Sequence, residues 1–349
     1  MGKIRVLVVD DSAVVREILA EKLSAHPRIE VVATAVDPYA ARAKIARNKI
    51  DVMTLDIEMP RMDGLVFLRH LMKYFPIPTI IVSSLADRQN EVSIAALELG
   101  AVDIVPKPGG PYSVEEIIDI LTEKILAASE VDFAKVKEEA GKNRKAAPRA
   151  KPTYLPRIAT TNKIIAVGAS TGGTSALEVL FKGFEPTFPP TAAVIHMPER
   201  FTTFFAERLD KLCAVSVKEA RDGEKAAMGT VYIAPGNYHL RVRAEGSQYV
   251  LEVRQGPKKF GQRPAVDPLF ESVAAHIGRN GIGVLLTGMG RDGAEGLLAI
   301  NRAGGRTIAQ DEATSIVFGM PKAAIDLKAA DMVLPIERIA QTIAASLSP

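Results

Sequence analysis

The chain has 349 residues, of which 47% are hydrophobic and 24% charged, and its formal net charge is +3. That length allows two domains with separate cores, and the small net charge argues against a nucleic-acid partner. The single cysteine, Cys213, excludes an internal disulfide framework and a cysteine-based zinc site. The sequence shows no signal segment and no apolar run of membrane-spanning length, so we expect a cytoplasmic protein without direct membrane insertion.

The first 125 or so residues alternate short apolar runs with amphipathic stretches. Helical spacing of apolar residues predicts helices such as Ala13 to Ser24 and Gly64 to Tyr74. Strands are expected at 4–10, 30–36, 51–57, 79–84 and 102–107. Five strands alternating with five helices predict an α/β fold with a doubly wound parallel sheet.

A basic, proline-containing stretch follows this first series. Its middle, "GKNRKAAPRAKPTYLPR", holds six basic residues, three prolines and no acidic residue. Low apolar content favours a flexible, solvated linker over a nucleic-acid arm. We therefore expect a first domain at 1–126, a flexible basic linker at 127–162 and a second domain at 163–349.

The second domain repeats the alternation of strands and helices. Strands are expected at 163–170, 191–197, 281–289, 305–311 and 331–335, which predicts a second doubly wound parallel sheet. Between Val215 and Val253 the texture changes to short alternating strands separated by turn signals. We interpret that region as an inserted β-hairpin region on the edge of the second sheet.

Polar residues end several strands of the first domain. Asp10 and Asp11 follow the first strand, Asp56 the third, Ser83 the fourth and Lys107 the fifth. In a parallel sheet these ends meet at one edge, where ligands bind. A single aspartate there is often only a helix cap, but three carboxylates in one crevice favour a shared Mg²⁺. The ammonium and hydroxyl groups suit the oxygens of a phosphoryl group.

The motifs "VVDDS", "DIEMPRMDG" and "KP" resemble those of response-regulator receiver domains, which are flavodoxin-like. The resemblance implies a histidine kinase as phosphodonor and a resident Mg²⁺. It implies these roles: Asp56 as phospho-acceptor, Asp10, Asp11, Asp56 and the backbone carbonyl of Glu58 as metal ligands, and Ser83 and Lys107 as phosphate-sensing residues. Receivers often carry an aromatic residue where this sequence has Ile104, so we expect signalling by a change in packing rather than by an aromatic switch.

The stretch "IIAVGASTGG" ends a buried strand of the second domain with Ser170 between small residues. This is either a plain strand-to-helix turn or a G-x-S-x-G elbow that presents a nucleophile. His196 and Asp292 also follow strands, at the same edge of the sheet. A serine hydroxyl needs a base, and an imidazole base needs a carboxylate that orients it. We therefore expect a Ser170–His196–Asp292 triad at an exposed sheet edge.

Backbone N–H groups are the natural donors to the oxyanion of such a triad. We expect them at Thr171, which opens the helix after Ser170, and in the loop at Met289. The remaining histidines lie in helical or hairpin patterns and are expected to be structural or on the surface: His26, His70, His239 and His276.

The segments "GASTGGTSAL", "IHMPERFT" and "LLTGMGRDGAEGL" resemble the catalytic domain of chemotaxis protein-glutamate methylesterases, a Rossmann-like serine hydrolase domain. The resemblance implies a phosphorylation-activated hydrolase that removes methyl esters from glutamates on chemoreceptor cytoplasmic helices and deamidates receptor glutamines, with no cofactor for this chemistry. Two alternatives remain open. In the first alternative, the turn at Ser170 binds a dinucleotide, although the turn lacks G-x-G-x-x-G spacing. In the other, the second domain binds a partner without catalysis.

Overall fold

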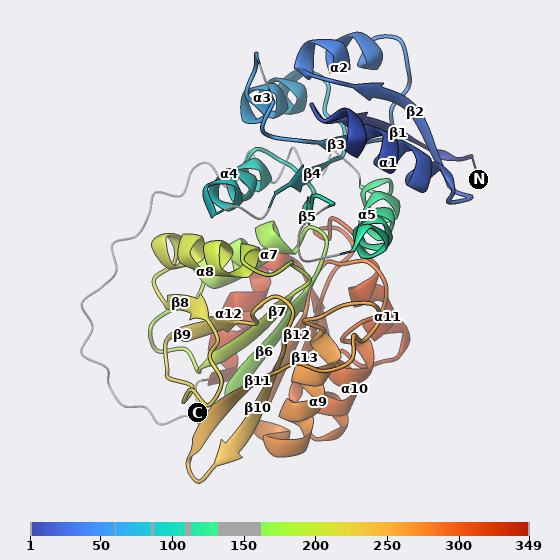
Figure 1. Ribbon diagram of the computed structural model, residues 1–349. Helices are drawn as coiled ribbons and strands as arrows, with labels where there is room; N and C mark the ends of the chain where they lie inside the picture. Colours follow the sequence, from blue (N-terminus) through green and yellow to red (C-terminus); the bar gives the residue numbers. More distant parts are fainter. Residues whose placement is uncertain (1, 60, 85–86, 109–112, 132–161, 348–349) are drawn as a thin grey trace. The chain divides into compact units, whose positions relative to one another are not determined.

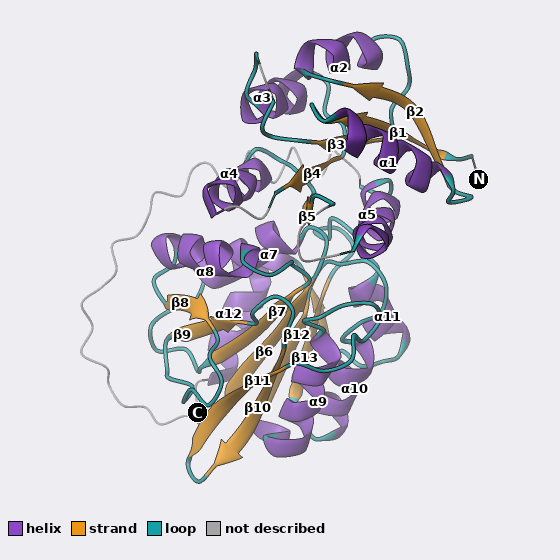
Figure 2. Cartoon of the chain, viewed as in Figure 1, coloured by secondary structure: helices purple, strands orange, loops and turns teal. Residues whose placement is uncertain are grey.

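The computed structural model describes residues 2–59, 61–84, 87–108, 113–131 and 162–347. The chain divides into two compact units, Met1–Arg144 and Lys145–Pro349. Most of the predicted linker, 132–161, lies outside the described residues. Each unit is an α/β structure, and the alternation of helices and strands within each can be followed in Figure 2.

The first unit is a five-stranded parallel sheet flanked by helices (Figure 1). Its strand order, β2-β1-β3-β4-β5, is that of flavodoxin-like folds. The elements in chain order are β1 (Ile4–Val9), α1 (Ala13–Ser24), β2 (Ile29–Ala35), α2 (Pro38–Ile45), β3 (Val52–Leu55), α3 (Gly64–Tyr74), β4 (Thr79–Ser83), α4 (Asp87–Glu98), β5 (Asp103–Pro106) and α5 (Val114–Ala128). The predicted alternation of five strands and five helices is confirmed.

Capping residues explain why α1 and α3 coincide with their predicted bounds. The Ser12 side chain accepts a hydrogen bond from the N–H of Val15, and the Asp63 side chain accepts one from the N–H of Leu65. Each cap supplies an acceptor that the first turn of a helix lacks. At the other end of the unit, α5 continues through Ala128, which is buried in the core. The helix thus extends two residues past the domain boundary predicted at 126.

The second unit contains a seven-stranded sheet in the order β14-β13-β12-β6-β7-β9-β8, and every strand pair in it is parallel. Its elements are β6 (Ile164–Ala169), α7 (Gly173–Lys182), β7 (Thr191–Ile195), α8 (Phe201–Leu212), β8 (Ser216–Glu219), β9 (Thr230–Ile233), β10 (His239–Glu245), β11 (Gln248–Arg254), α9 (Val266–His276), a 3₁₀ turn (Gly278–Asn280), β12 (Gly281–Leu285), α10 (Ala294–Arg302), β13 (Arg306–Gln310), α11 (Met320–Asp326), β14 (Met332–Leu334) and α12 (Ile336–Leu347).

The region between Val215 and Val253 contains the predicted hairpin, formed by β10 and β11, but its first two strands differ from the prediction of a hairpin region on the sheet edge. β8 and β9 are parallel strands that extend the main sheet beyond β7. Only β10 and β11 form an antiparallel hairpin, which is a separate two-stranded sheet packed on α9. Buried Val231 and Tyr232, which lie on opposite faces of β9, explain the difference, because a strand buried on both faces belongs inside a parallel sheet.

The position of β6 in the sheet creates the crevice that matters for function. β6 pairs with β7, the next strand along the chain, on one side and with β12 on the other. Helices α7, α8 and α12 pack as one group and α9, α10 and α11 as another (Figure 1). The chain therefore reverses direction of winding at β6, and ligands of such sheets bind beyond the carboxyl ends of the strands at that point.

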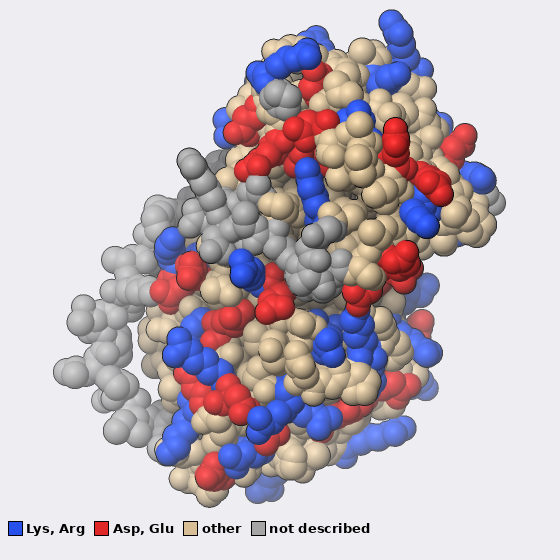
Figure 3. All heavy atoms as spheres, in the orientation of Figure 1, with Lys and Arg blue, Asp and Glu red and all other residues tan. Residues whose placement is uncertain are grey.

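The surface carries charges of both signs. On the face shown in Figure 3, basic and acidic side chains are interspersed over the second unit. Among the described helices, none has the length and apolarity needed to cross a membrane.

Candidate functional site

Ser170 stands at the turn between β6 and α7. Its N–H donates to the carbonyl of Thr287 at 2.9 Å, and its carbonyl accepts from the N–H of Gly173 at 2.7 Å. Gly172 completes the turn with a φ of 77°, a conformation that glycine adopts without steric cost. The backbone of the serine is thus fixed on both sides, which holds its hydroxyl at the carboxyl end of β6.

His196 follows β7 directly and bridges the other two residues of the predicted triad. Its Nδ1 lies 3.0 Å from Ser170 Oγ, and its Nε2 lies 2.8 Å from Asp292 Oδ2. An ionised carboxylate only accepts hydrogen bonds, so the proton of the neutral ring belongs on Nε2. Nδ1 is then the acceptor for the serine proton. The two nitrogens have the opposite assignment from the one described for chymotrypsin, with the same chemical roles.

Asp292 lies in the loop between β12 and α10, and it binds two backbone N–H groups in addition to His196. Its carboxylate accepts the N–H of Val266 at 2.6 Å and that of Asp267 at 3.0 Å, the first two residues of α9. Although burial opposes it, the hydrogen bond from His196 and these N–H groups lower the pKa of Asp292. The carboxylate therefore stays ionised beside the imidazole.

The prediction of an exposed edge is wrong for all three residues: Ser170 is 7% exposed, His196 6% and Asp292 only 2%. α9 has no side-chain cap of its own, because the residue before it is Ala265. Asp292 supplies the missing acceptors and is therefore a structural cap as well as the partner of His196. The sequence signal for this role is that Ala265, and not Ser, Thr, Asp or Asn, stands at the N-cap position of α9.

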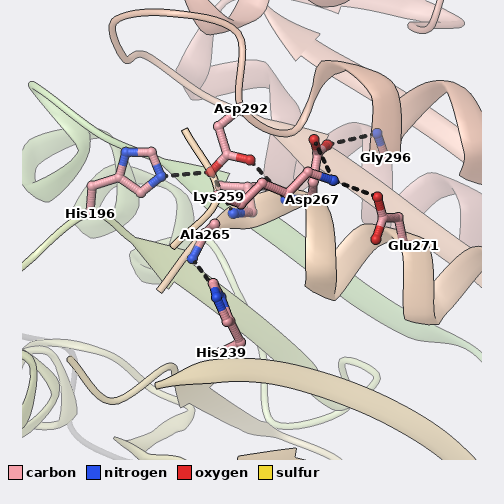
Figure 4. Close-up of polar contacts among 9 residues, drawn as sticks. His196, His239, Lys259, Ala265, Asp267, Glu271, Asp292 and Gly296 are labelled. Carbon is pink, nitrogen blue, oxygen red and sulfur yellow. Dashed lines mark hydrogen bonds and ion pairs between the residues drawn. The ribbon is translucent and has the colours of Figure 1, made fainter. Parts of the chain in front are cut away.

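A second layer of contacts holds the first turn of α9 (Figure 4). Buried Asp267 accepts the N–H of Gly296 at 2.8 Å and lies 3.1 Å from Lys259 Nζ. His239 Nδ1 accepts the N–H of Ala265 at 3.2 Å. This buried histidine therefore has a structural role, as the sequence predicts.

The loop after β12 is clamped next to the serine, where the oxyanion donors are expected. The Thr287 hydroxyl donates to the carbonyl of Thr171 at 3.0 Å, and the carbonyl of Gly288 accepts the N–H of Met320 at 2.8 Å. Thr171 directly follows the serine and Met289 directly follows Gly288. The aim of their N–H groups at an oxyanion remains a prediction.

The described residues of the first unit include an acidic cluster typical of a Mg²⁺ site. Oxygens of Asp10, Asp11 and Asp56 all lie within 4.8 Å of one another. Asp10 Oδ2 is buried without a hydrogen-bond donor, although Lys107 Nζ lies 3.1 Å away. Lys107 also contacts Asp56 Oδ2 at 2.7 Å. Three convergent carboxylates, one of them with an unsatisfied oxygen, fit a divalent cation.

The remaining receiver residues lie where parallel strands end. Ser83 closes β4 and is 3% exposed, and its carbonyl accepts the N–H of Lys107 at 2.8 Å. Ile104 is buried in β5 opposite Ile81 of β4, so it belongs to the core of the sheet. The serine and the lysine therefore meet at the same edge as the carboxylates. No described contact tests the backbone carbonyl of Glu58 as a ligand.

Burial raises the pKa of Asp56 to about 6, against the opposing effect of Lys107. Burial also acts on Lys107, but the hydrogen bond and charge of Asp56 and the charge of Asp10 raise the pKa of its ammonium group above the usual value. The cluster thus holds one cation against three acidic groups. Its charge is unbalanced without a further cation.

Replacing Asp56 should stabilise the metal-free receiver. A carboxyl whose folded pKa exceeds its unfolded value of 3.8 costs stability as the pH rises from about 4 to 6, and the full cost persists above that range. Two pKa units correspond to about 3 kcal/mol. We expect Asp56→Asn to unfold later than wild type in urea at pH 7.5 without Mg²⁺, with little difference at pH 4. Equal stabilities at pH 7.5 would contradict this explanation of the cluster.

A serine, an imidazole and a carboxylate joined by hydrogen bonds at the switch point of a parallel sheet define the second unit as a serine hydrolase. The first unit has the fold and the acidic cluster of a receiver. Residues 165–343 match the CheB methylesterase family, and residues 6–119 match the response regulator receiver domain. The chain belongs to the CheB family, whose members are protein-glutamate methylesterases and protein-glutamine glutaminases with a receiver domain.

Relatives match over nearly the whole length. A protein-glutamate methylesterase/protein-glutamine glutaminase of Syntrophus aciditrophicus is 50% identical and covers 98% of this chain and 99% of its own. A protein of the same name from Salmonella typhimurium is 47% identical, and the match covers 100% of this chain and 98% of its own. The crystal structure of the Thermotoga maritima CheB methylesterase catalytic domain is 40% identical, covers 53% of this chain and 98% of its own, and has a TM-score of 0.52.

Proposed function

We propose that the second unit hydrolyses methyl esters of glutamate side chains on the cytoplasmic helices of chemoreceptors and deamidates receptor glutamines. The observation that carries the proposal is the hydrogen-bond chain from Ser170 through His196 to Asp292. The names of the relatives include both activities. A dinucleotide-binding turn at Ser170 is disfavoured. Such a turn calls for an acidic residue after the next strand, but the residue after β7 is His196, which is hydrogen-bonded to Ser170.

The geometry supports a two-step acyl transfer. Ser170 Oγ attacks the ester carbonyl while His196 Nδ1 takes its proton, and the new ester joins the substrate acyl group to the serine. The imidazolium then returns the proton to the departing methoxide, which leaves as methanol. Water attacks the acyl-enzyme by the same proton route and releases glutamate. With a glutamine side chain the leaving group is ammonia.

Asp292 contributes orientation and charge. Its Oδ2 holds the Nε2 proton, so Nδ1 faces the serine with its lone pair, and its negative charge stabilises the imidazolium. The N–H groups of Thr171 and Met289 are our candidates for binding the oxyanion. Both lie in segments whose backbone is already fixed by hydrogen bonds, as an oxyanion site requires.

For the receiver we propose that a histidine kinase phosphorylates Asp56 and that this releases the hydrolase activity. Asp10, Asp11, Asp56 and the carbonyl of Glu58 would hold Mg²⁺, which neutralises charge on a transferring phosphoryl group. Lys107 already contacts Asp56 and would turn to a phosphoryl oxygen, with Ser83 binding another. Because Ile104 is buried in the core where other receivers often have an aromatic switch residue, we expect phosphorylation to be signalled by a rearrangement of packing.

Phosphorylation tests this half of the proposal. Acetyl phosphate should label the full chain only when Mg²⁺ is present, because the carboxylates must be screened before a phosphate approaches. Mass spectrometry should place the label on Asp56. Asp56→Asn should remove it, whereas Asp63→Asn, at the cap of α3, should not. A label that persists on another residue in Asp56→Asn would show that the acceptor is misassigned.

A further inference from the structure

Phe260 stands at the tip of a tight turn close to the catalytic acid. Lys259 and Gln262 exchange two backbone hydrogen bonds, at 3.1 and 3.0 Å, so Phe260 and Gly261 form a two-residue loop. Their φ values are 52° and 75°. Such a loop favours Asn, Asp or Gly at its first position, because positive φ strains other residues. Phenylalanine is an unfavourable choice for folding at this place.

The aromatic ring does not offset that strain by packing in the core. Phe260 is 42% exposed. The contact found for its ring is the guanidinium of Arg291, 5.3 Å from the ring centroid. Arg291 is itself exposed and directly precedes Asp292. Within the described residues, no carboxylate lies within ion-pair distance of this guanidinium. This exposed guanidinium, carried by the neighbour of Asp292 in the sequence, is therefore available to an acidic partner.

The turn is fixed to the same helix that the catalytic acid caps. Lys259 Nζ donates to Glu271 of α9 at 2.6 Å and lies 3.1 Å from Asp267 of α9, whose N–H is bound by Asp292 (Figure 4). On the other side, Arg263 binds the side chain of Asn237 at 3.0 Å. The turn that carries Phe260 is thus fixed to the helix that Asp292 caps, and its ring lies under the guanidinium of the residue that precedes Asp292.

We propose that Phe260 and Arg291 form a recognition platform for the acidic face of the substrate helix. This inference rests on the proposed function of the hydrolase site. Side chains three or four positions apart lie on one face of a helix, so an ester at Ser170 brings its helical neighbours alongside the platform. Arg291, positioned over the ring of Phe260, binds a carboxylate of such a neighbour. Phe260 packs against the aliphatic carbons of the same helix.

The partner follows from the chemistry of the site. Methyl esters of glutamate arise on helices that carry glutamates, so unmodified carboxylates close to the ester are part of the substrate itself. A guanidinium without an acidic partner, next to an apolar ring, complements such a surface. A small ester has no neighbouring carboxylate and gains nothing from the platform. The platform therefore affects receptor substrates selectively.

The test compares two substrates in the full-length protein. Methanol release from methylated receptor membranes and hydrolysis of p-nitrophenyl acetate are measured for wild type, Phe260→Asn, Arg291→Ala and Arg291→Glu. Arg279→Ala is the matched control, an exposed arginine that precedes β12. Asparagine suits the turn better than phenylalanine, so Phe260→Asn should fold at least as well as wild type.

We expect kcat/KM on receptors to fall about 10- to 100-fold in Arg291→Ala, the range for one charge-assisted hydrogen bond, and further in Arg291→Glu. Phe260→Asn should lose about three- to tenfold. The small ester should change less than about twofold, and added salt should weaken wild type more than Arg291→Ala. Wild-type kcat/KM on receptors in these variants would overturn the platform, as would equal losses on both substrates. A wild type that cleaves the small ester but no receptor would instead refute the proposed function.

Discussion

Ser170→Ala reduces ester hydrolysis about a million-fold in our account, because no other described group occupies the position of the attacking oxygen. His196→Ala has a similar effect, since the hydroxyl then loses the acceptor for its proton. Initial rates of methanol release from methylated receptors measure both. Binding of receptor should persist in Ser170→Ala, because the substitution removes a single oxygen.

Ser175→Ala is the matched control for the nucleophile. Ser175 is exposed on α7, five residues from Ser170, and has no place in the triad. It should hydrolyse receptors at the wild-type rate. A fluorophosphonate should label Ser170 in wild type and in Ser175→Ala but not in Ser170→Ala. Near-normal hydrolysis by Ser170→Ala would require a different nucleophile.

Asp292→Asn combines a catalytic loss with a structural one. The amide orients the imidazole with the wrong tautomer, which costs about 10⁴-fold in turnover by analogy with other triads. An amide also offers one acceptor oxygen where two carboxylate oxygens now bind His196 and the N–H groups of Val266 and Asp267. A buried N–H left without an acceptor costs about 1–3 kcal/mol. Urea unfolding should therefore show a destabilised second unit.

The loss of stability in Asp292→Asn should depend on pH in a defined direction. The folded pKa of Asp292 lies below its unfolded value, so the carboxylate stabilises the fold at pH above about 4 and loses that effect as the pH falls further. The difference in stability between wild type and Asp292→Asn should shrink at acidic pH. Glu295→Gln, an exposed acid three residues away, should change neither activity nor stability. An Asp292→Asn variant as stable as wild type would contradict the capping role.

The triad could be predicted because its three residues follow parallel strands. A buried apolar run directly precedes Ser170 and His196, and Asp292 lies in the loop that follows another such run. A parallel sheet brings the carboxyl ends of these strands to one edge. The same rule predicts the meeting of Asp10, Asp56 and Lys107. The sequence does not determine which imidazole nitrogen faces the serine, since this depends on the orientation of a single side chain.

Long-range contacts determine the features that could not be predicted from the sequence. The bonds from α9 to Asp292 join residues about 25 positions apart, and no local pattern encodes them. Strands β8 and β9 are short and have a turn signal between them, as in a hairpin, but β9 pairs in parallel with both β7 and β8. Pairing partners depend on the whole sheet, so short strands of this kind carry little information about them. Capped helices such as α1 were predictable because Ser12 acts locally.

The most direct test of the account is methanol release from methylated chemoreceptor membranes by the full-length chain, with and without acetyl phosphate and Mg²⁺. We expect release above the Ser170→Ala background, accelerated by acetyl phosphate in wild type and unaffected by it in Asp56→Asn. Release no greater than that of Ser170→Ala, or the same acceleration in Asp56→Asn as in wild type, would contradict it.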